Sequence, residues 1–152
     1  MHQSAEELTQ RQANMAVLAR APGERLKALW GEAGIAVEHE MVRGPETGLV
    51  TVRGRIGGGG SPFNVGEATV TRSTVRLASG GVGHAYALGR DKEKSRISAL
   101  IDALWQDTAL QPKLAEQIIA PLAGEIERDD ADKRAQTAAT RVDFFTMVRG
   151  ED

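Results

Sequence analysis

The sequence predicts an α+β protein in which an antiparallel β-meander of about four strands carries helices on one face. The stretch from Arg43 to Arg96 holds 12 of the 17 glycines and alternates polar with apolar residues, whereas its flanks are rich in Ala, Leu, Glu and Gln. The connections between strands are short, which favours antiparallel pairing. We therefore expect one domain over residues 1–152, with a helical hairpin (1–34), a sheet (35–89), helices (91–140) and an apolar tail (141–152).

Two helices are expected in the first 34 residues. Ser4, followed by Glu7 three residues later, fits a capping box for a helix that ends near Arg20. Pro22 then starts a shorter helix, and Gly34 stands where a left-handed residue commonly ends one. We expect the two helices to pack together as a hairpin.

Four strands are expected between residues 35 and 89. Gly44–Gly48 has the composition of a turn, and Ser79–Gly81 that of a tight hairpin turn. Gly66 and the change of apolar parity between Val70 and Val75 suggest a bulge within the third strand. The strands span residues 35–42, 49–56, 63–77 and 83–88.

Helical spacing returns after residue 90. The apolar stripe there is the most regular in the chain and predicts a helix packed on the sheet. Pro112 opens a further helix, Pro121 interrupts or kinks it, and Ala-rich sequence continues to about Ala139. The stripe consists of Ile97, Leu100, Ile101, Leu104 and Trp105.

Composition excludes several classes of protein. The chain has no cysteine, which removes disulfide scaffolds, thiolate zinc sites, iron–sulfur ligation and thiol nucleophiles. No apolar run reaches the roughly 18 residues of a membrane span, and no signal-peptide core is evident, so we expect a cytoplasmic protein without a membrane partner. The net charge of −2 and the few aromatic residues argue against nucleic-acid binding. Within Arg43–Arg96, however, nine basic residues face four acidic ones.

Four consecutive glycines, Gly57, Gly58, Gly59 and Gly60, lie between two expected strands. The segment approaches a phosphate-binding loop, but Gly60 occupies the position of the lysine, and a proline and a strand follow where a helix is needed. The glycines form either a permissive link between strands or a loop whose bare backbone lets another chain or an anion come close.

Arginines recur along the expected sheet. Arg53 and Arg55 are two residues apart, and Arg72 and Arg76 are four apart, so each pair shares one face if no bulge intervenes. The arginines form either a cationic stripe suited to carboxylates and phosphates or a ladder of cross-strand ion pairs.

No catalytic constellation is evident. The three histidines are scattered, and His39, on the apolar face of its strand, is expected to be a partly buried structural residue. Asp129, Asp130 and Asp132 resemble a metal cluster but are expected at a helix start, where they cap the helix and interact with its dipole. We therefore expect neither a catalytic residue nor a metal site.

The tail is apolar where a chain end is normally polar. Phe144 and Phe145 are two of the three phenylalanines. This tail either returns to cover its own sheet or docks on another chain.

Several segments resemble one bacterial family in register. They are Arg43–Val50, Val52–Arg55, Pro62–Arg72, Gly83–Tyr86, Gly89–Lys92 and Ala138–Phe145. Together they make most of the chain similar to the PhnG family, the G subunit of the bacterial carbon–phosphorus lyase core complex.

The resemblance implies a role in phosphonate degradation. Members of the family join H, I and J subunits in a core complex. With H, I and a transiently bound ATP-binding-cassette-like L subunit, G supports formation of alpha-D-ribose 1-methylphosphonate 5-triphosphate from ATP and methylphosphonate. The resemblance also implies that I carries the nucleosidase chemistry, that J carries the iron–sulfur cluster, and that G binds no cofactor and has no active site of its own.

The leading hypothesis is therefore an interaction subunit of a transferase complex, buried against the I subunit through its tail and basic strands. The alternative is a stand-alone anion- or nucleotide-binding module that uses Gly57–Gly60 and the arginines. Candidate contacts to a partner or to a phosphate group are Arg53, Arg55, Glu67, Arg72, His84 and Arg90.

Overall fold

The structure is a computed structural model that describes residues 5–56 and 59–140. No helix in this part of the chain is long and apolar enough to cross a membrane. The elements, in chain order, are α1 (Ala5–Arg20), α2 (Gly23–Ala33), β1 (His39–Gly54), β2 (Phe63–Leu77), β3 (Val82–Leu88), α3 (Lys92–Leu104), α4 (Gln111–Leu114), the π-helical turn η2 (Ala115–Ile119) and α5 (Ala120–Ala139).

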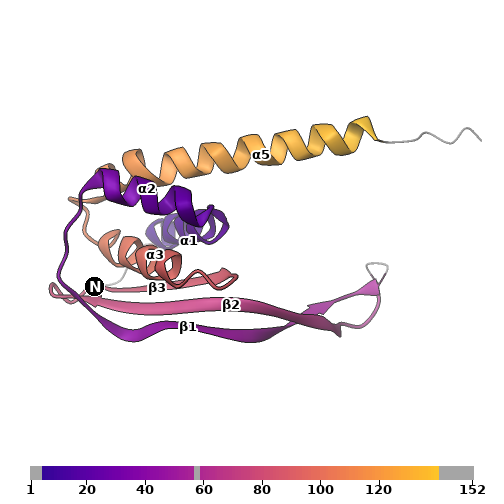
Figure 1. Cartoon of the computed structure of the whole chain (residues 1–152), viewed down its shortest axis with the longest axis horizontal. Helices are drawn as coiled ribbons and strands as arrows, with labels where there is room; N and C mark the ends of the chain where they lie inside the picture. The colour runs from indigo at the N-terminus through magenta and orange to yellow at the C-terminus, as the bar shows by residue number, and fades with distance from the viewer. Residues whose placement is uncertain (1–4, 57–58, 141–152) are drawn as a thin grey trace, which may run out of the picture.

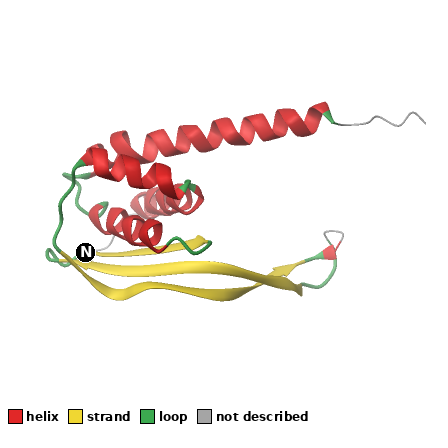
Figure 2. Ribbon diagram, viewed as in Figure 1, coloured by secondary structure: helices red, strands yellow, loops and turns green. Residues whose placement is uncertain are grey.

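The sheet is antiparallel, with β2 between β1 and β3. The helices lie on one side of it, and its other side carries no described element (Figure 1, Figure 2). α3 packs directly on β2 and β3, α1 contacts α3 and β3, and α2 and α5 lie farther from the sheet. The β1–β2 ribbon and α5 both extend beyond the packed region in the same direction (Figure 1). The α+β class and the antiparallel sheet are therefore confirmed.

The described residues form three strands, so the prediction of about four is wrong. The expected turn at Gly44–Gly48 continues β1, which pairs with β2 on both sides of it. Register shifts between Met41 and Arg43 and between Arg43 and Glu46 absorb the irregular residues. Pro45 is tolerated because β1 is an edge strand, where a missing N–H need not break the ladder.

The bulge predicted within the third strand is present next to Gly66, but it does not lie where the apolar parity changes. β2 pairs with β3 without interruption from Val70 to Arg76, so no extra residue separates Val70 from Val75. The bulged residue of β2, which has no partner in β1, is Val65 near the start of the strand. The change of apolar parity therefore means that the apolar side chains of β2 move from the face without helices at Val70 to the helical face at Val75.

The first two helices pack chiefly on elements other than each other, so the hairpin is not confirmed. α1 packs on α3, β3 and α5, and α2 packs on α3 and η2. Gly34 ends α2 as predicted, with a left-handed φ of 60° and its N–H donated to the carbonyl oxygen of Gly31 at 3.2 Å. The expected capping residue Ser4 lies outside the described residues.

The core surrounds α3. The stripe predicted for this helix is confirmed, because its aliphatic members are at most 3% exposed and Trp105 packs partly buried against them. Burial of each such side chain contributes about 1.5–3 kcal/mol. Side chains from the sheet, α2, α4, η2 and α5 complete the core, among them Leu26, Leu29, Val75, Leu77, Leu114, Ile118 and Leu122.

α5 follows directly on the π-helical turn. Pro121 lies in the first turn of α5, where its missing N–H is tolerated. The aspartates Asp129, Asp130 and Asp132 lie within this helix rather than at a helix start, so the predicted cap is wrong. Asp130 instead pairs with Arg20 of α1 at 2.7 Å.

α3 touches the backbone of β3 at Gly83. This glycine is buried, and a Cβ atom there would overlap the carbonyl oxygen of Ala99 and the backbone nitrogen of Ala103. Glycine is required here because two backbones approach closely.

We expect Gly83→Ala to lower the free energy of unfolding by about 3 kcal/mol, because the added methyl group must push α3 away from β3. Gly31→Ala is the control, since nothing lies within 4 Å of a Cβ atom there and its helix should gain about 0.5–1 kcal/mol. Urea denaturation measures both. A Gly83→Ala variant as stable as the wild type would contradict the close packing.

Candidate functional site

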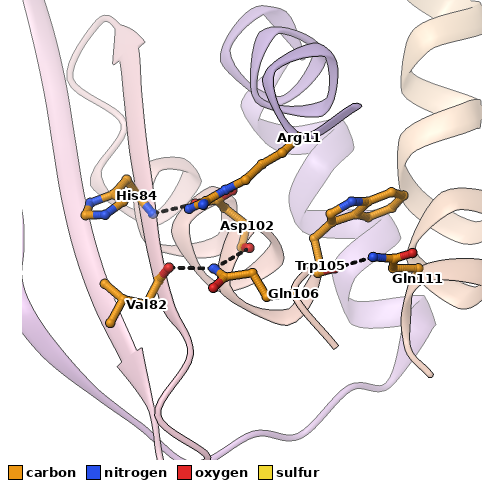
Figure 3. A network of polar contacts seen from close by, with 7 residues as sticks. All are labelled: Arg11, Val82, His84, Asp102, Trp105, Gln106 and Gln111. Atoms are coloured by element: carbon orange, nitrogen blue, oxygen red, sulfur yellow. Dashed lines mark hydrogen bonds and ion pairs between the residues drawn. The ribbon is translucent and has the colours of Figure 1, made fainter. Parts of the chain in front are cut away.

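A buried carboxylate joins three elements where the helices meet the sheet (Figure 3). The side chain of Asp102 in α3 is 1% exposed and accepts hydrogen bonds from Nε and Nη2 of Arg11 in α1 at 2.7 and 2.8 Å. It also accepts the backbone N–H of His84 in β3 at 2.8 Å. Because both carboxylate oxygens are engaged by internal donors, Asp102 fixes the position of these elements.

Two glutamines extend this network (Figure 3). Nε2 of Gln106 donates to the carbonyl oxygen of Val82 at 2.6 Å, and Nε2 of Gln111 donates to the carbonyl oxygen of Trp105 at 2.8 Å. The first contact holds the start of β3 on α3, and the second holds the end of α3 on α4.

Asp102→Ala should lower the free energy of unfolding by about 3–5 kcal/mol, because it leaves the Arg11 guanidinium and the His84 N–H without their partner. Asp129→Ala is the control: that side chain is 76% exposed and contacts Lys133 at 3.7 Å, so the change should be under about 0.5 kcal/mol. Urea titrations compare the two variants. Equal effects at both positions would rule out a special contribution from Asp102.

The start of α3 is tied to α2 and α1. Asp91 caps α3 by accepting the backbone N–H of Lys94 at 2.9 Å and pairs with the ammonium of Lys27 at 3.0 Å. The hydrogen bond from the Lys94 backbone, and after it that from Lys27, lowers the pKa of Asp91 against the opposing effect of partial burial. The Lys94 ammonium donates to the carbonyl oxygen of Ala19 at 2.8 Å, and burial lowers the pKa of Lys94.

The stabilisation by Asp91 depends on pH. Because its pKa is lower in the folded state, the contribution is full above the unfolded pKa of about 3.9 and is lost as the pH falls through the folded value. Asp91→Ala should lower the free energy of unfolding by about 1 kcal/mol at neutral pH. Urea titrations at decreasing pH should show this difference shrinking in acid, and a constant difference would contradict the assignment.

The predicted cationic stripe does not form. Arg72 and Arg76 share the face of the sheet that points away from the helices, since Ser73 and Val75, which alternate with them, are buried on the helical side. They pair with Glu46 at 3.3 Å and Glu40 at 3.0 Å across the β1–β2 ribbon. The alternative, a ladder of cross-strand ion pairs, is what the structure contains.

Three other predicted arginines are separate from this ladder. Arg53 follows Val52 in β1 and so lies on the opposite face from it, whereas Arg55 lies beyond the end of β1 and Arg90 beyond the end of β3. All three are exposed, and none forms an ion pair within the part of the chain that the structure describes. Their guanidinium groups are therefore open to an external carboxylate or phosphate.

The remaining polar candidates do not form a cluster. His84 is exposed, with Nδ1 3.2 Å from Oγ1 of Thr74, and Glu67 is exposed elsewhere on β2. His39, expected to be partly buried, is exposed; its Nδ1 lies 3.0 Å from the carbonyl oxygen of Val37. The burial prediction is wrong because β1 is an edge strand and His39 begins it.

The glycine loop and the tail are described only in part. Gly59 and Gly60 are exposed in the connection between β1 and β2. Gly57–Gly58 and the tail residues Phe144–Phe145 lie outside the described residues. Their predicted roles stay predictions.

Apolar side chains gather on the face of the sheet that carries no helix. Tyr86 is 52% exposed and Leu88 is 73% exposed at one edge of this group. An adjoining hollow of about 200 Å³ has Val70 and Arg72 in its lining. We call the group the outer apolar surface; it consists of Val50, Val52, Phe63, Tyr86 and Leu88.

The described residues offer no alternative centre for chemistry. Within residues 5–56 and 59–140, no three His, Asp or Glu side chains are placed to hold a metal ion. A larger hollow of about 440 Å³, between the end of α1 and α5, contains the Arg20–Asp130 pair and has no hydroxyl or imidazole in its lining.

Sequence reasoning missed both the outer apolar surface and the Asp102 network. The parity change between Val70 and Val75 signalled the surface but was interpreted as a bulge. Asp102 and Arg11 are 91 residues apart, and no local pattern pairs them.

A small α+β chain with an uncovered apolar sheet face, and without a catalytic cluster among its described residues, is typical of a subunit within a larger assembly. The comparisons with known proteins agree with this class. The chain belongs to the family of the phosphonate metabolism protein PhnG, whose model matches residues 9–150. It is 52% identical over 145 residues to the alpha-D-ribose 1-methylphosphonate 5-triphosphate synthase subunit PhnG of Rhizobium meliloti (strain 1021), which covers 95% of this chain and 92% of that protein.

Proposed function

We propose that this chain is the G subunit of a phosphonate-degrading complex that forms alpha-D-ribose 1-methylphosphonate 5-triphosphate from ATP and methylphosphonate. The observation that carries this proposal is the 52% identity to the synthase subunit of Rhizobium meliloti, which extends over 95% of this chain and 92% of the relative. A match of that extent includes surface as well as core positions and so supports a shared role as well as a shared fold.

In this proposal the chain is a required subunit without an active site of its own. Its companions are H, I and J subunits, with I in the most direct contact, and an ATP-binding-cassette-like subunit that joins transiently. The absence of cysteine assigns the iron–sulfur cluster to a companion. We assign no cofactor to this chain and place the complex in the cytoplasm, without a membrane or nucleic-acid partner.

The residues proposed for contact are three arginines that form no ion pair in the described part of the chain. Arg53, Arg55 and Arg90 are exposed and form no ion pair in the described part of the chain, so each can engage a carboxylate of a companion or a phosphate of the ligand. The tail residues Phe144–Phe145 are proposed to dock on a companion.

A stand-alone nucleotide-binding module is not favoured. Gly59 and Gly60 lead into β2 rather than into an α-helix, so the described part of the glycine segment has no α-helix N-terminus to hold a phosphate. The hollow of about 440 Å³ has four acidic and three basic residues in its lining, so it offers no net positive charge to a nucleotide phosphate.

Co-expression with the H, I and J subunits, followed by size-exclusion chromatography, tests the proposal. The wild type should elute with its companions at micromolar concentration. The double variant Arg53→Glu/Arg55→Glu should weaken assembly or turnover of ATP with methylphosphonate at least about tenfold, because it reverses two unpaired charges.

Arg128→Glu is the matched control, an exposed arginine of α5 to which no contact is assigned. A wild-type chain that stays separate from the companions contradicts the proposed function. Normal assembly and turnover of the Arg53→Glu/Arg55→Glu variant contradicts only the assignment of these two arginines.

A further inference from the structure

The apolar side chains of β2 lie on one face at the end of the strand and on the other face before it. Val75 and Leu77 point toward α3 and are 0% and 5% exposed. Val70 pairs with Leu88 in an uninterrupted register and therefore lies on the face away from the helices, where Val70 is 4% exposed and Leu88 is 73% exposed. The second face therefore buries Val70 but leaves the neighbouring Leu88 open to solvent.

The outer apolar surface continues this second face across the whole sheet. Val50 and Val52 lie on it in β1, opposite Ala68 and Gly66 of β2. In β3, Tyr86 and Leu88 are 52% and 73% exposed. No described element covers these residues, since the helices lie on the other side (Figure 1). A contiguous exposed apolar patch on a folded domain marks a site of interaction.

The border of the surface carries excess positive charge. Glu46 is shared between Arg43 at 3.2 Å and Arg72 at 3.3 Å, so one carboxylate faces two guanidinium groups. Arg90 follows two residues after Leu88 and has no ion-pair partner in the described part of the chain. The two carboxylates on this face, those of Glu40 and Glu46, are both engaged by arginines.

We propose that the outer apolar surface docks a companion subunit whose contacting face is apolar at its centre and bears carboxylates at its edge. This inference rests on the proposed function, which supplies the companions. An apolar centre gives affinity, and unlike charges around it fix orientation and speed association.

Charge argues against a second copy of this chain as the occupant of this face. Two copies of this chain joined by a two-fold axis would set the same positive border against itself. The described part of the chain ends at Thr140, at the far end of α5 on the helical side of the sheet (Figure 1). The outer apolar surface points away from that side.

Two aspartate substitutions test the surface in the co-expressed complex. Leu88→Asp and Val52→Asp should each weaken co-elution with the H, I and J subunits at least about tenfold, because each places a charge in a buried apolar contact. Both side chains are exposed in the free chain, so circular dichroism and urea denaturation of the isolated variants should match the wild type. Leu49→Asp is the control: Leu49 is 63% exposed but pairs with Thr69 and lies on the opposite face of the ribbon.

The outcomes separate this inference from the proposed function. If the wild type fails to assemble, the proposed function is wrong and the inference falls with it. If the wild type assembles and Leu88→Asp assembles equally well, or Leu49→Asp loses assembly to the same extent, only the docking surface is wrong. A dimer of the isolated wild type that Leu88→Asp dissociates in sedimentation analysis would likewise overturn it.

Discussion

The arrangement of the fold depends on the direct contact between α3 and β3. At Gly83 the strand lies against the backbone of the helix, and one turn away Asp102 receives the His84 N–H and the Arg11 guanidinium. This contact places α3 close enough to pack on β2 and β3 together, and it fixes α1 to the same point. The helices farther from the sheet, α2 and α5, then pack on α3 and α1. The positions of α3 and α1 are set by backbone contact and a buried ion pair as well as by apolar packing.

The same contact limits how much of the sheet the helices cover. β3 has seven residues, whereas β1 and β2 have 16 and 15, so the ribbon continues past the end of the helical layer. In the ribbon, Val50, Val52 and Phe63 lie on the face without helices, whereas Leu49 lies on the opposite face. The last turns of α5, residues 131–139, are likewise exposed throughout. A helix that is polar and exposed on all sides is typical of a segment that bridges to another body. Both extensions fit a subunit whose surface is completed by its companions.

The features of this fold that could be predicted from the sequence are those that depend on residues close together in the chain. The stripe of α3, the left-handed Gly34 and the hairpin turn at Gly80 follow from spacing and residue type within a few positions. The continuation of β1 through Pro45 could not be predicted. A proline flanked by glycines predicts a turn unless its strand is known to lie at the edge of the sheet. The outer apolar surface required knowing where the helical cover stops. Of the predicted site, the ion-pair alternative for Arg72 and Arg76 was correct, whereas Arg55 lies outside the strand that was expected to align it with Arg53.

We infer that a companion subunit covers the sheet face that carries no helix. Hydroxyl-radical footprinting of the free chain and of the assembled complex tests it most directly, since it reports the exposure of individual side chains. Tyr86 and Leu88, which are exposed in the free chain, should lose most of their reactivity on assembly, while Leu49 on the opposite face should keep more of its own. Unchanged reactivity of Tyr86 and Leu88 in a fully assembled complex would contradict the claim.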